Sequence, residues 1–197
     1  MAADESPPNR TPSAFLRLLG RLEQSAALDP VVHRVEPLAS RIVANERLRR
    51  VLHGEATGIP LHIIFTDAPL GAWWMAQILD LFPGNGMRLA ATRLVGLGVV
   101  AAVPTALTGW AEWARADRGT RRVGIVHATA NAIGTLVFLS SWAARSRSRH
   151  DLGVWLGRLG GVVLLVGAMC GGYMRSDRQA VPDAGPAAQQ RPEQRKR

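Results

Sequence analysis

Four long apolar stretches dominate the pattern of hydrophobic and polar positions along the chain. They cover residues 61–83, 89–113, 123–143 and 152–174, and each is 21 to 25 residues long. A helix rises about 1.5 Å per residue, so roughly 20 residues cross the ~30 Å hydrocarbon layer of a membrane. Stretches such as LGVVAAVPTALTG are apolar or small on every side, whereas a long helix of a soluble protein keeps a polar face. The pattern predicts an all-α integral membrane protein whose residues 54–175 form a four-helix antiparallel bundle.

The region before the bundle, residues 11–53, shows shorter amphipathic patterns. Apolar positions recur at helical spacing after Ser13 or Thr11, either of which is a candidate N-cap. A second stripe consists of Val31, Val35, Leu38 and Ile42. These cytoplasmic or interfacial helices are expected either to lie along the membrane surface or to pack on the end of the bundle. Residues 1–10 and the basic tail 176–197 are polar and proline-containing, and we expect them to be disordered.

Charge supports the membrane interpretation and sets an orientation. The chain combines 47% hydrophobic residues with a net charge of +9, and all but one of its 24 basic residues are arginine. They gather where the apolar stretches end, which indicates topology signals and contacts to anionic lipid rather than nucleic acid binding. Nine arginines flank the spans on the side of the N-terminus and four on the other, so both termini are expected to be cytoplasmic. The acidic start, MAADESPPNR, lacks the pattern of a cleavable signal peptide.

Two groups of polar residues interrupt the apolar stretches. Near the outer end of the predicted bundle, Asp80 and Arg93 come to similar depth across a short turn, GNGMR, and Arg158 is a possible third member. An ion pair is expected there, because it lowers the cost of burying such charges in a medium of low dielectric constant. Glycines at four-residue spacing in the last stretch, from Gly153 onward, predict close helix packing, and the single Cys170 is expected to be a small packing residue.

The second group lies within about two turns of the cytoplasmic boundary, where antiparallel threading brings all four spans to one level. Its members are His62, Asp67, Glu112, His127, Asn131 and Tyr173. Two histidines at equal depth could ligate haem, and a histidine beside an aspartate could relay protons. Alternatively, each imidazole bonds a carbonyl or a hydroxyl group at a helix end. No metal site is predicted from ligand spacing, and no cofactor is predicted apart from the haem alternative.

Three stretches of the chain also resemble a known family in order and spacing. GIPLHIIFTDAPLGAW, ATRLVGLGVVAAVPTALTGWAEW and RRVGIVHATANAIG are similar to a bacterial membrane family catalogued as domain of unknown function 2231, over residues 45–174. The resemblance implies four transmembrane helices in a bacterial plasma membrane. Relatives are sometimes fused to a Rieske iron–sulfur domain, which implies an association with membrane redox work. This chain has Tyr173 where the family often has histidine, and one cysteine, so any iron–sulfur partner would be a separate protein.

Three functions are compatible with these patterns. The first is a membrane subunit or anchor without enzymatic activity, which contacts the lipid bilayer and a membrane or redox protein. The second is an electron-transfer subunit that holds haem b through His62 and His127. The third is a small proton-coupled channel or transporter along a polar stripe of the first span, which consists of His62, Thr66, Trp73, Gln77 and Asp80. The sequence contains no catalytic triad or phosphate-binding loop, so no enzymatic reaction is predicted.

Overall fold

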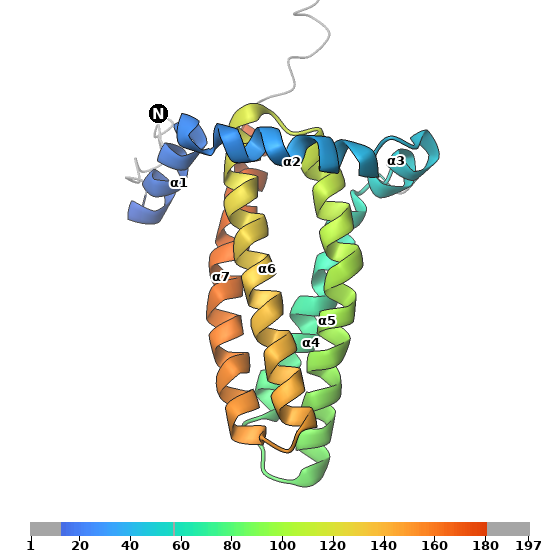
Figure 1. The fold of residues 1–197 in the computed structure, drawn as a ribbon, viewed down its shortest axis with the longest axis vertical. Helices are drawn as coiled ribbons and strands as arrows, with labels where there is room; N and C mark the ends of the chain where they lie inside the picture. Colours follow the sequence, from blue (N-terminus) through green and yellow to red (C-terminus); the bar gives the residue numbers. More distant parts are fainter. Residues whose placement is uncertain (1–12, 57, 181–197) are drawn as a thin grey trace, which may run out of the picture.

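The computed structural model describes residues 13–56 and 58–180, and these form α-helices and one 3-10 turn without strands (Figure 1). The elements are α1 (Ala14–Gln24), η1 (Ala26–Leu28), α2 (Asp29–Ile42), α3 (Glu46–Leu52), α4 (Leu61–Leu79), α5 (Asn85–Ala114), α6 (Arg118–Ser146) and α7 (His150–Ala180). The predicted all-α class is therefore confirmed. Helix α7 continues to Ala180, beyond the predicted start of the disordered tail at residue 176. The predicted disordered segment 1–10 and the rest of the tail lie outside the described residues.

Helices α4 to α7 lie side by side along the long axis of the molecule, and α2 lies across one end of them (Figure 1). We call the end that carries α2 the upper end, and the end with the α4–α5 and α6–α7 connections the lower end. Helix α6 packs closely along α7, and α4 packs closely along α5. The predicted tight turn between α4 and α5 is confirmed, and Gly84 in it adopts a φ of 118°, a conformation that favours glycine.

Three helices of the described chain are long and apolar enough to cross a membrane, namely α5, α6 and the part of α7 up to Arg175. Helix α4 is not among them. It has 19 residues and carries the polar side chains of His62, Asp67 and Gln77 within that length. The length and composition expected of a membrane span are thus present in three of the four predicted spans.

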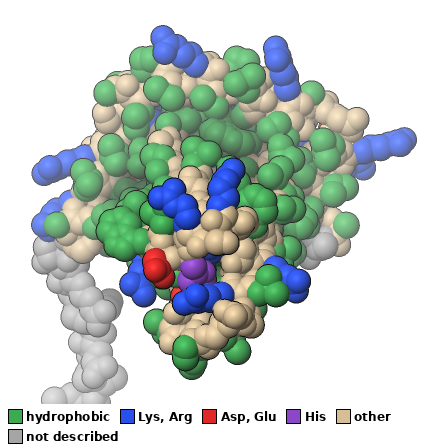
Figure 2. Space-filling view, turned by 60° about the horizontal axis from the view of Figure 1, so that its bottom comes forward, with side chains coloured by type: hydrophobic (Ala, Val, Ile, Leu, Met, Phe, Trp, Pro, Cys, Tyr) green, Lys and Arg blue, Asp and Glu red, His purple; other side chains and the backbone are tan. Residues whose placement is uncertain are grey.

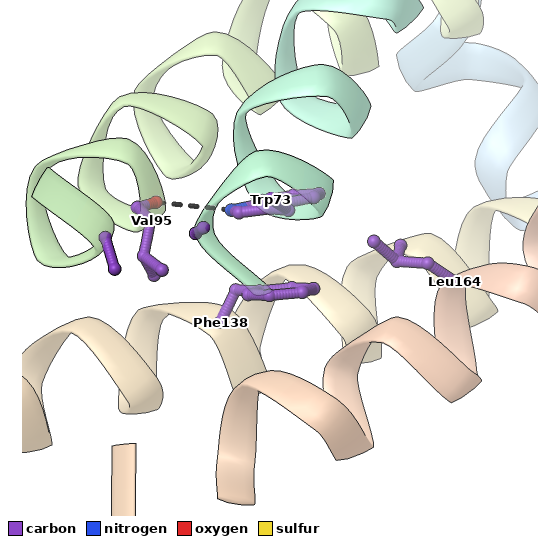
Figure 3. Close-up of a cluster of buried hydrophobic side chains, with 6 residues drawn as sticks. Trp73, Val95, Phe138 and Leu164 are labelled. Atoms are coloured by element: carbon purple, nitrogen blue, oxygen red, sulfur yellow. Dashed lines mark hydrogen bonds between the residues drawn. The ribbon is translucent and has the colours of Figure 1, made fainter. Parts of the chain in front are cut away.

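The middle of the bundle is a compact apolar core centred on Trp73 and Phe138 (Figure 3). Their rings stack with centroids 4.4 Å apart and planes 4° from parallel. The Trp73 indole Nε1–H donates to the carbonyl oxygen of Val95 at 3.2 Å, so its polar atom is satisfied within the protein. A buried aromatic ring of this size needs space on the facing helix, and α5 provides it at Gly98, which lies directly against the indole.

The helices α1 and α2 pack on the upper end of the bundle, which is one of the two placements that the sequence left open. Leu19 of α1 is buried with Val123 and Cys170, which confirms Cys170 as a packing residue. Ser13 caps α1 by accepting a hydrogen bond from the Leu16 amide at 3.3 Å. Folding these segments onto the bundle removes part of their apolar faces from water and from the membrane surface.

Helix α2 is rotated relative to the predicted stripe. Val32 and Ala39 are its buried residues, whereas Val31 and Leu38, which the pattern placed on the apolar face, are 39% and 59% exposed. The reason is electrostatic. Residues 29, 32, 36 and 39 share one face of a helix, and the acids at two of these positions, Asp29 and Glu36, meet arginines at the start of α6.

Asp29 is the centre of this contact. Its carboxylate accepts hydrogen bonds from the Arg122 guanidinium at 2.7 and 2.9 Å and from Arg118 at 2.7 Å. The hydrogen bonds from Arg122, and then those from Arg118, lower the pKa of Asp29 from 3.8 to about 2 despite partial desolvation. The carboxylate therefore stays ionised, and α2 stays paired to α6, throughout the physiological pH range.

We expect Gly98→Ala to destabilise the protein by about 1–3 kcal/mol, the usual cost of overpacking a core. An added Cβ would lie 2.4 Å from the Trp73 Nε1, and the indole is held by its stack on Phe138. Thermal unfolding of the purified protein in detergent measures the effect. Gly71→Ala is the matched control, because a Cβ there meets nothing within 4 Å, and it should be neutral or slightly stabilising. Equal melting temperatures for both variants would contradict the packing argument.

Candidate functional site

The first predicted histidine, His62, lies one residue into α4 and faces α5. Its Nδ1 lies 3.1 Å from the carbonyl oxygen of Thr105, and a carbonyl can only accept, so this nitrogen carries the proton. The Thr108 hydroxyl lies 3.4 Å from the same nitrogen and donates its own hydrogen to the Thr105 carbonyl at 2.8 Å. Gly109 gives the ring its space, since a Cβ there would lie 2.9 Å from the His62 Cε1. The ring is thereby fixed with its Nε2 unprotonated.

The second predicted histidine, His127, belongs to α6 and faces α7. Its Nδ1–H donates to the carbonyl oxygen of Gly167 at 2.8 Å, and its Nε2 accepts from the side-chain amide of Asn131 at 3.0 Å. Both side chains lie against glycines of α7. A Cβ on Gly171 would lie 3.2 Å from the imidazole, and one on Gly167 would lie 2.6 Å from the Asn131 amide oxygen. The bonding capacity of this imidazole is fully used within the protein.

The two imidazoles meet between the helix pairs. Their ring centroids lie 6.5 Å apart and their planes are 84° from parallel. Both rings donate from Nδ1 to a backbone carbonyl, which is the arrangement that metal-bound histidines keep in order to present Nε2 to a metal. Within the described residues, however, no group of three or more His, Cys, Asp or Glu side chains is placed to hold a metal ion.

The other predicted members of this cluster lie elsewhere. Glu112 accepts from Arg115 at 2.6 Å and lies 3.0 Å from the Nδ1 of His53, which ties the end of α3 to α5. The Tyr173 hydroxyl donates to Glu23 at 2.6 Å and ties α7 to α1. Asp67 is exposed on the outer surface of α4. The structure therefore brings together His62, His127 and Asn131 and separates the remaining three.

His53 is a partner of the predicted site residue Glu112, and the sequence did not indicate this contact. Its side chain is only 6% exposed, and its partner Glu112 is 12% exposed. The two residues are 59 positions apart, and His53 follows a short helix in a polar stretch with no distinctive pattern. Only the packing of α3 beside α5 brings them into contact.

At the lower end, the structure corrects the predicted ion pair. Asp80 pairs with Arg145 of α6, not with Arg93, through two hydrogen bonds of 2.7 and 2.6 Å. The two side chains are 3% and 0% exposed, whereas Arg93 and Arg158 are exposed on the outside of their helices. Depth alone suggested Arg93 as the partner. The rotation of α5 about its axis turns Arg93 away, and the last turn of α6 places Arg145 in the interior instead.

The surroundings of Arg145 explain how a guanidinium fits inside the bundle. Its Nε–H donates to the Ser141 hydroxyl at 3.2 Å, and that hydroxyl donates to the carbonyl oxygen of Gly153 at 2.6 Å. A Cβ on Gly153 would lie 2.4 Å from the Arg145 side chain, and one on Gly157 would lie 3.4 Å from it. The glycine spacing of α7 thus allows close packing, as predicted. At this end the side chain that packs against the glycines is the charged one of Arg145.

No protein-family model, curated protein or solved structure matches the chain. The resemblance to domain of unknown function 2231 therefore stays a prediction from the sequence.

We expect Asp80→Asn to lower the free energy of unfolding by about 3–5 kcal/mol, because the guanidinium of Arg145 would be left buried without a counter-charge. Thermal unfolding in a single detergent measures the loss. Adding Arg145→Gln to Asp80→Asn should recover part of it, since no net charge then remains in the interior. Arg93→Gln is the control for removing an exposed arginine and should leave the melting temperature unchanged. A single Asp80→Asn variant as stable as the wild type would refute the structural importance of this pair.

Proposed function

We propose that this chain is a four-span integral protein of a bacterial plasma membrane, with both termini cytoplasmic, and that it serves as a membrane subunit or anchor. The observation that carries this proposal is the contrast between the outside and the inside of the bundle. Large apolar side chains are exposed along the outside of the long helices, where Asp67, Arg93 and Arg158 are exposed charges. His62, His127, Asp80 and Arg145 have their partners within the bundle.

The outside of α5 shows the contrast clearly. Its exposed apolar row consists of Leu97, Val100, Val103 and Leu107, with exposed fractions between 49% and 69%. Similar rows run along the other helices, with Leu136 at 61% on α6 and Val162 at 61% on α7. Soluble monomers rarely expose contiguous apolar surface of this extent, whereas lipid chains solvate it. Helix α4 continues this surface with Ile64, Trp74 and Ile78, which supports its assignment as the fourth span.

The inside of the bundle favours an anchor over a conducting path. The His62–His127 site lies in the upper half and the Asp80–Arg145 pair lies at the lower end. Between them, the stacked rings of Trp73 and Phe138 fill the core with apolar surface. A proton or solute path requires a continuous series of polar groups, and this core interrupts it.

The arrangement of the ends supports the orientation. Helix α1 and the last turns of α7 both lie at the upper end (Figure 1), where Tyr173 bonds Glu23. The same end gathers most of the arginines that flank the spans, which is typical of a cytoplasmic face. There α1, α2 and α3 form a platform with exposed apolar residues, among them Leu38 and Val51, which suits the docking of a cytoplasmic or membrane protein.

Topology reporters test the membrane placement. A reporter fused at Arg88, close to the α4–α5 turn, should be active only in its periplasmic form, and one fused at Arg197 only in its cytoplasmic form. The reason is that an even number of spans returns the chain to the side from which it started. A periplasmic reporter at Arg197, or a cytoplasmic one at Arg88, would refute the proposed four-span topology.

A second candidate function, electron transfer through haem b, is favoured by the bonding of the two histidines. His62 and His127 both fix their Nδ1–H on a carbonyl, which leaves the Nε2 of each ring as the potential ligand. The Asn131 amide occupies the Nε2 of His127, so ligation requires this amide to move away. Haem, if bound here, would supply one-electron chemistry, and His62 and His127 would be the residues that hold it.

A visible spectrum decides this second candidate. Protein purified from cells supplied with haem should show a Soret band, and His62→Ala or His127→Ala should abolish it because either substitution removes one axial ligand. His33→Ala is the control, since His33 lies on the exposed side of α2. A wild-type preparation without a Soret band excludes haem binding and leaves the anchor function standing.

A further inference from the structure

A cavity of about 470 Å³ opens at the lower end of the bundle, beside the buried ion pair. It lies between the α4–α5 connection and the first two turns of α7. Its lining combines three basic side chains, Arg88, His150 and Arg158, with two acids and six apolar residues, among them Phe82 and Trp155. Figure 2 shows this end of the molecule, where a histidine and an acidic side chain lie among several arginines. The lining of the cavity thus has a basic component and an apolar one.

The basic component carries an excess of positive charge. The carboxylate of Asp80 also lines the cavity, but both of its oxygens are bonded to Arg145, so its charge is already balanced. Among the residues whose side chains the structure describes, Arg88 and Arg158 form no ion pair with an acid. Asp151 is the remaining acid in the lining, and the two arginines outnumber it. An anion that enters the cavity therefore meets net attraction.

Two further features strengthen this attraction. Helix α7 begins at His150, which lines the cavity, so the positive end of the helix dipole lies close to it. Arg158 lies two turns, or about 12 Å, further along the same apolar helix. A guanidinium at that depth is costly unless an anion or the interface reaches it. The cavity extends to Arg158 and gives an anion that access.

The apolar component indicates what kind of molecule carries the anion. Trp155 is 64% exposed and Phe82 is 56% exposed, and both stand at the rim where the bundle leaves its apolar length. Aromatic rings in this position are typical of membrane interfaces, where they contact the region between headgroups and chains. Arginine, in turn, binds phosphate oxygens with paired hydrogen bonds.

We propose that this cavity binds a phosphate-bearing anionic amphiphile, with its phosphate on Arg88 and Arg158 and its hydrocarbon part along Trp155 and Phe82. A phospholipid of the outer leaflet is the source that the apolar component favours. That source rests on the proposed membrane placement, whereas the recognition of phosphate by the two arginines does not.

The test uses the full-length protein in detergent, with native mass spectrometry to measure retention of added phosphatidylglycerol against phosphatidylcholine. We expect preferential retention of phosphatidylglycerol by the wild type. The double variant Arg88→Gln/Arg158→Gln should bind it at least about tenfold more weakly, since each lost charge-assisted contact is worth roughly that factor. Both arginines are exposed, so the variant should fold normally, and its melting temperature without added lipid verifies this.

Arg93→Gln is the matched control, because it removes an exposed arginine from the same half of the bundle but outside the cavity. It should retain phosphatidylglycerol as the wild type does. Equal loss in the control and the double variant would show that binding depends on overall charge, and would overturn the proposal. So would equal retention of both lipids by the wild type together with no response to phosphate.

Inorganic phosphate separates the two sources of the anion. If phosphate raises the melting temperature of the wild type more than chloride at equal ionic strength, and the double variant does not respond, the cavity recognises phosphate itself. That result without a preference for phosphatidylglycerol assigns the site to a soluble phosphate compound. The wild type could show neither a preference for phosphatidylglycerol nor a response to phosphate while the topology reporters confirm four spans. That outcome overturns this inference alone and does not affect the proposed function.

Discussion

Side chains from α6 enter the surface of α7 at its glycines, and the order of the bundle depends on this contact. Arg145 lies against Gly153, Phe138 against Gly160, and Asn131 with His127 against Gly167 and Gly171. The missing Cβ atoms allow the two helices to approach closely, and the freed space is filled by groups of very different chemistry. One helix surface thereby holds a charged group at the lower end, an aromatic ring in the middle and an imidazole in the upper half.

This arrangement follows from the free-energy cost of burying polar groups inside the bundle, where water does not solvate them. Asp80 and Arg145 satisfy each other through two hydrogen bonds, and Ser141 takes a further donor of the guanidinium. His62 and His127 donate hydrogen bonds to the backbone carbonyls of Thr105 and Gly167. The polar groups of each site are bonded to one another or to the adjacent backbone, and the apolar core around Trp73 separates the two sites. The bundle therefore combines paired polar groups inside with a largely apolar exterior, on which Asp67, Arg93 and Arg158 are exposed charges.

At the upper end, by contrast, charged side chains are exposed to water and form ion pairs there. Asp29 and Glu36 bind arginines of α6, and Glu23 accepts from Tyr173 of α7. These contacts join segments about 85 to 150 positions apart in the chain, and they fix the rotation of α2 as well as its position. Exposed ion pairs alone contribute little to stability, but here they act together with the buried side chains of Leu19, Val32 and Ala39. The result is a helical platform held on the end of the bundle.

The sequence by itself determined the helical class, the approximate ends of the four long helices, the turn before α5, an N-cap at Thr11 or Ser13 and the pairing of the two histidines at one level. These features depend on local periodicity, length and turn chemistry, which a chain carries regardless of its neighbours. Only the tertiary structure decided that Asp80 binds Arg145, that Asp67 faces outward, that His53 meets Glu112 and that α2 turns its acids towards α6. Depth along a helix follows from residue number, but the direction of a side chain depends on how each helix is rotated and which helix lies beside it. That rotation is set by contacts between distant segments, and no local pattern contains it.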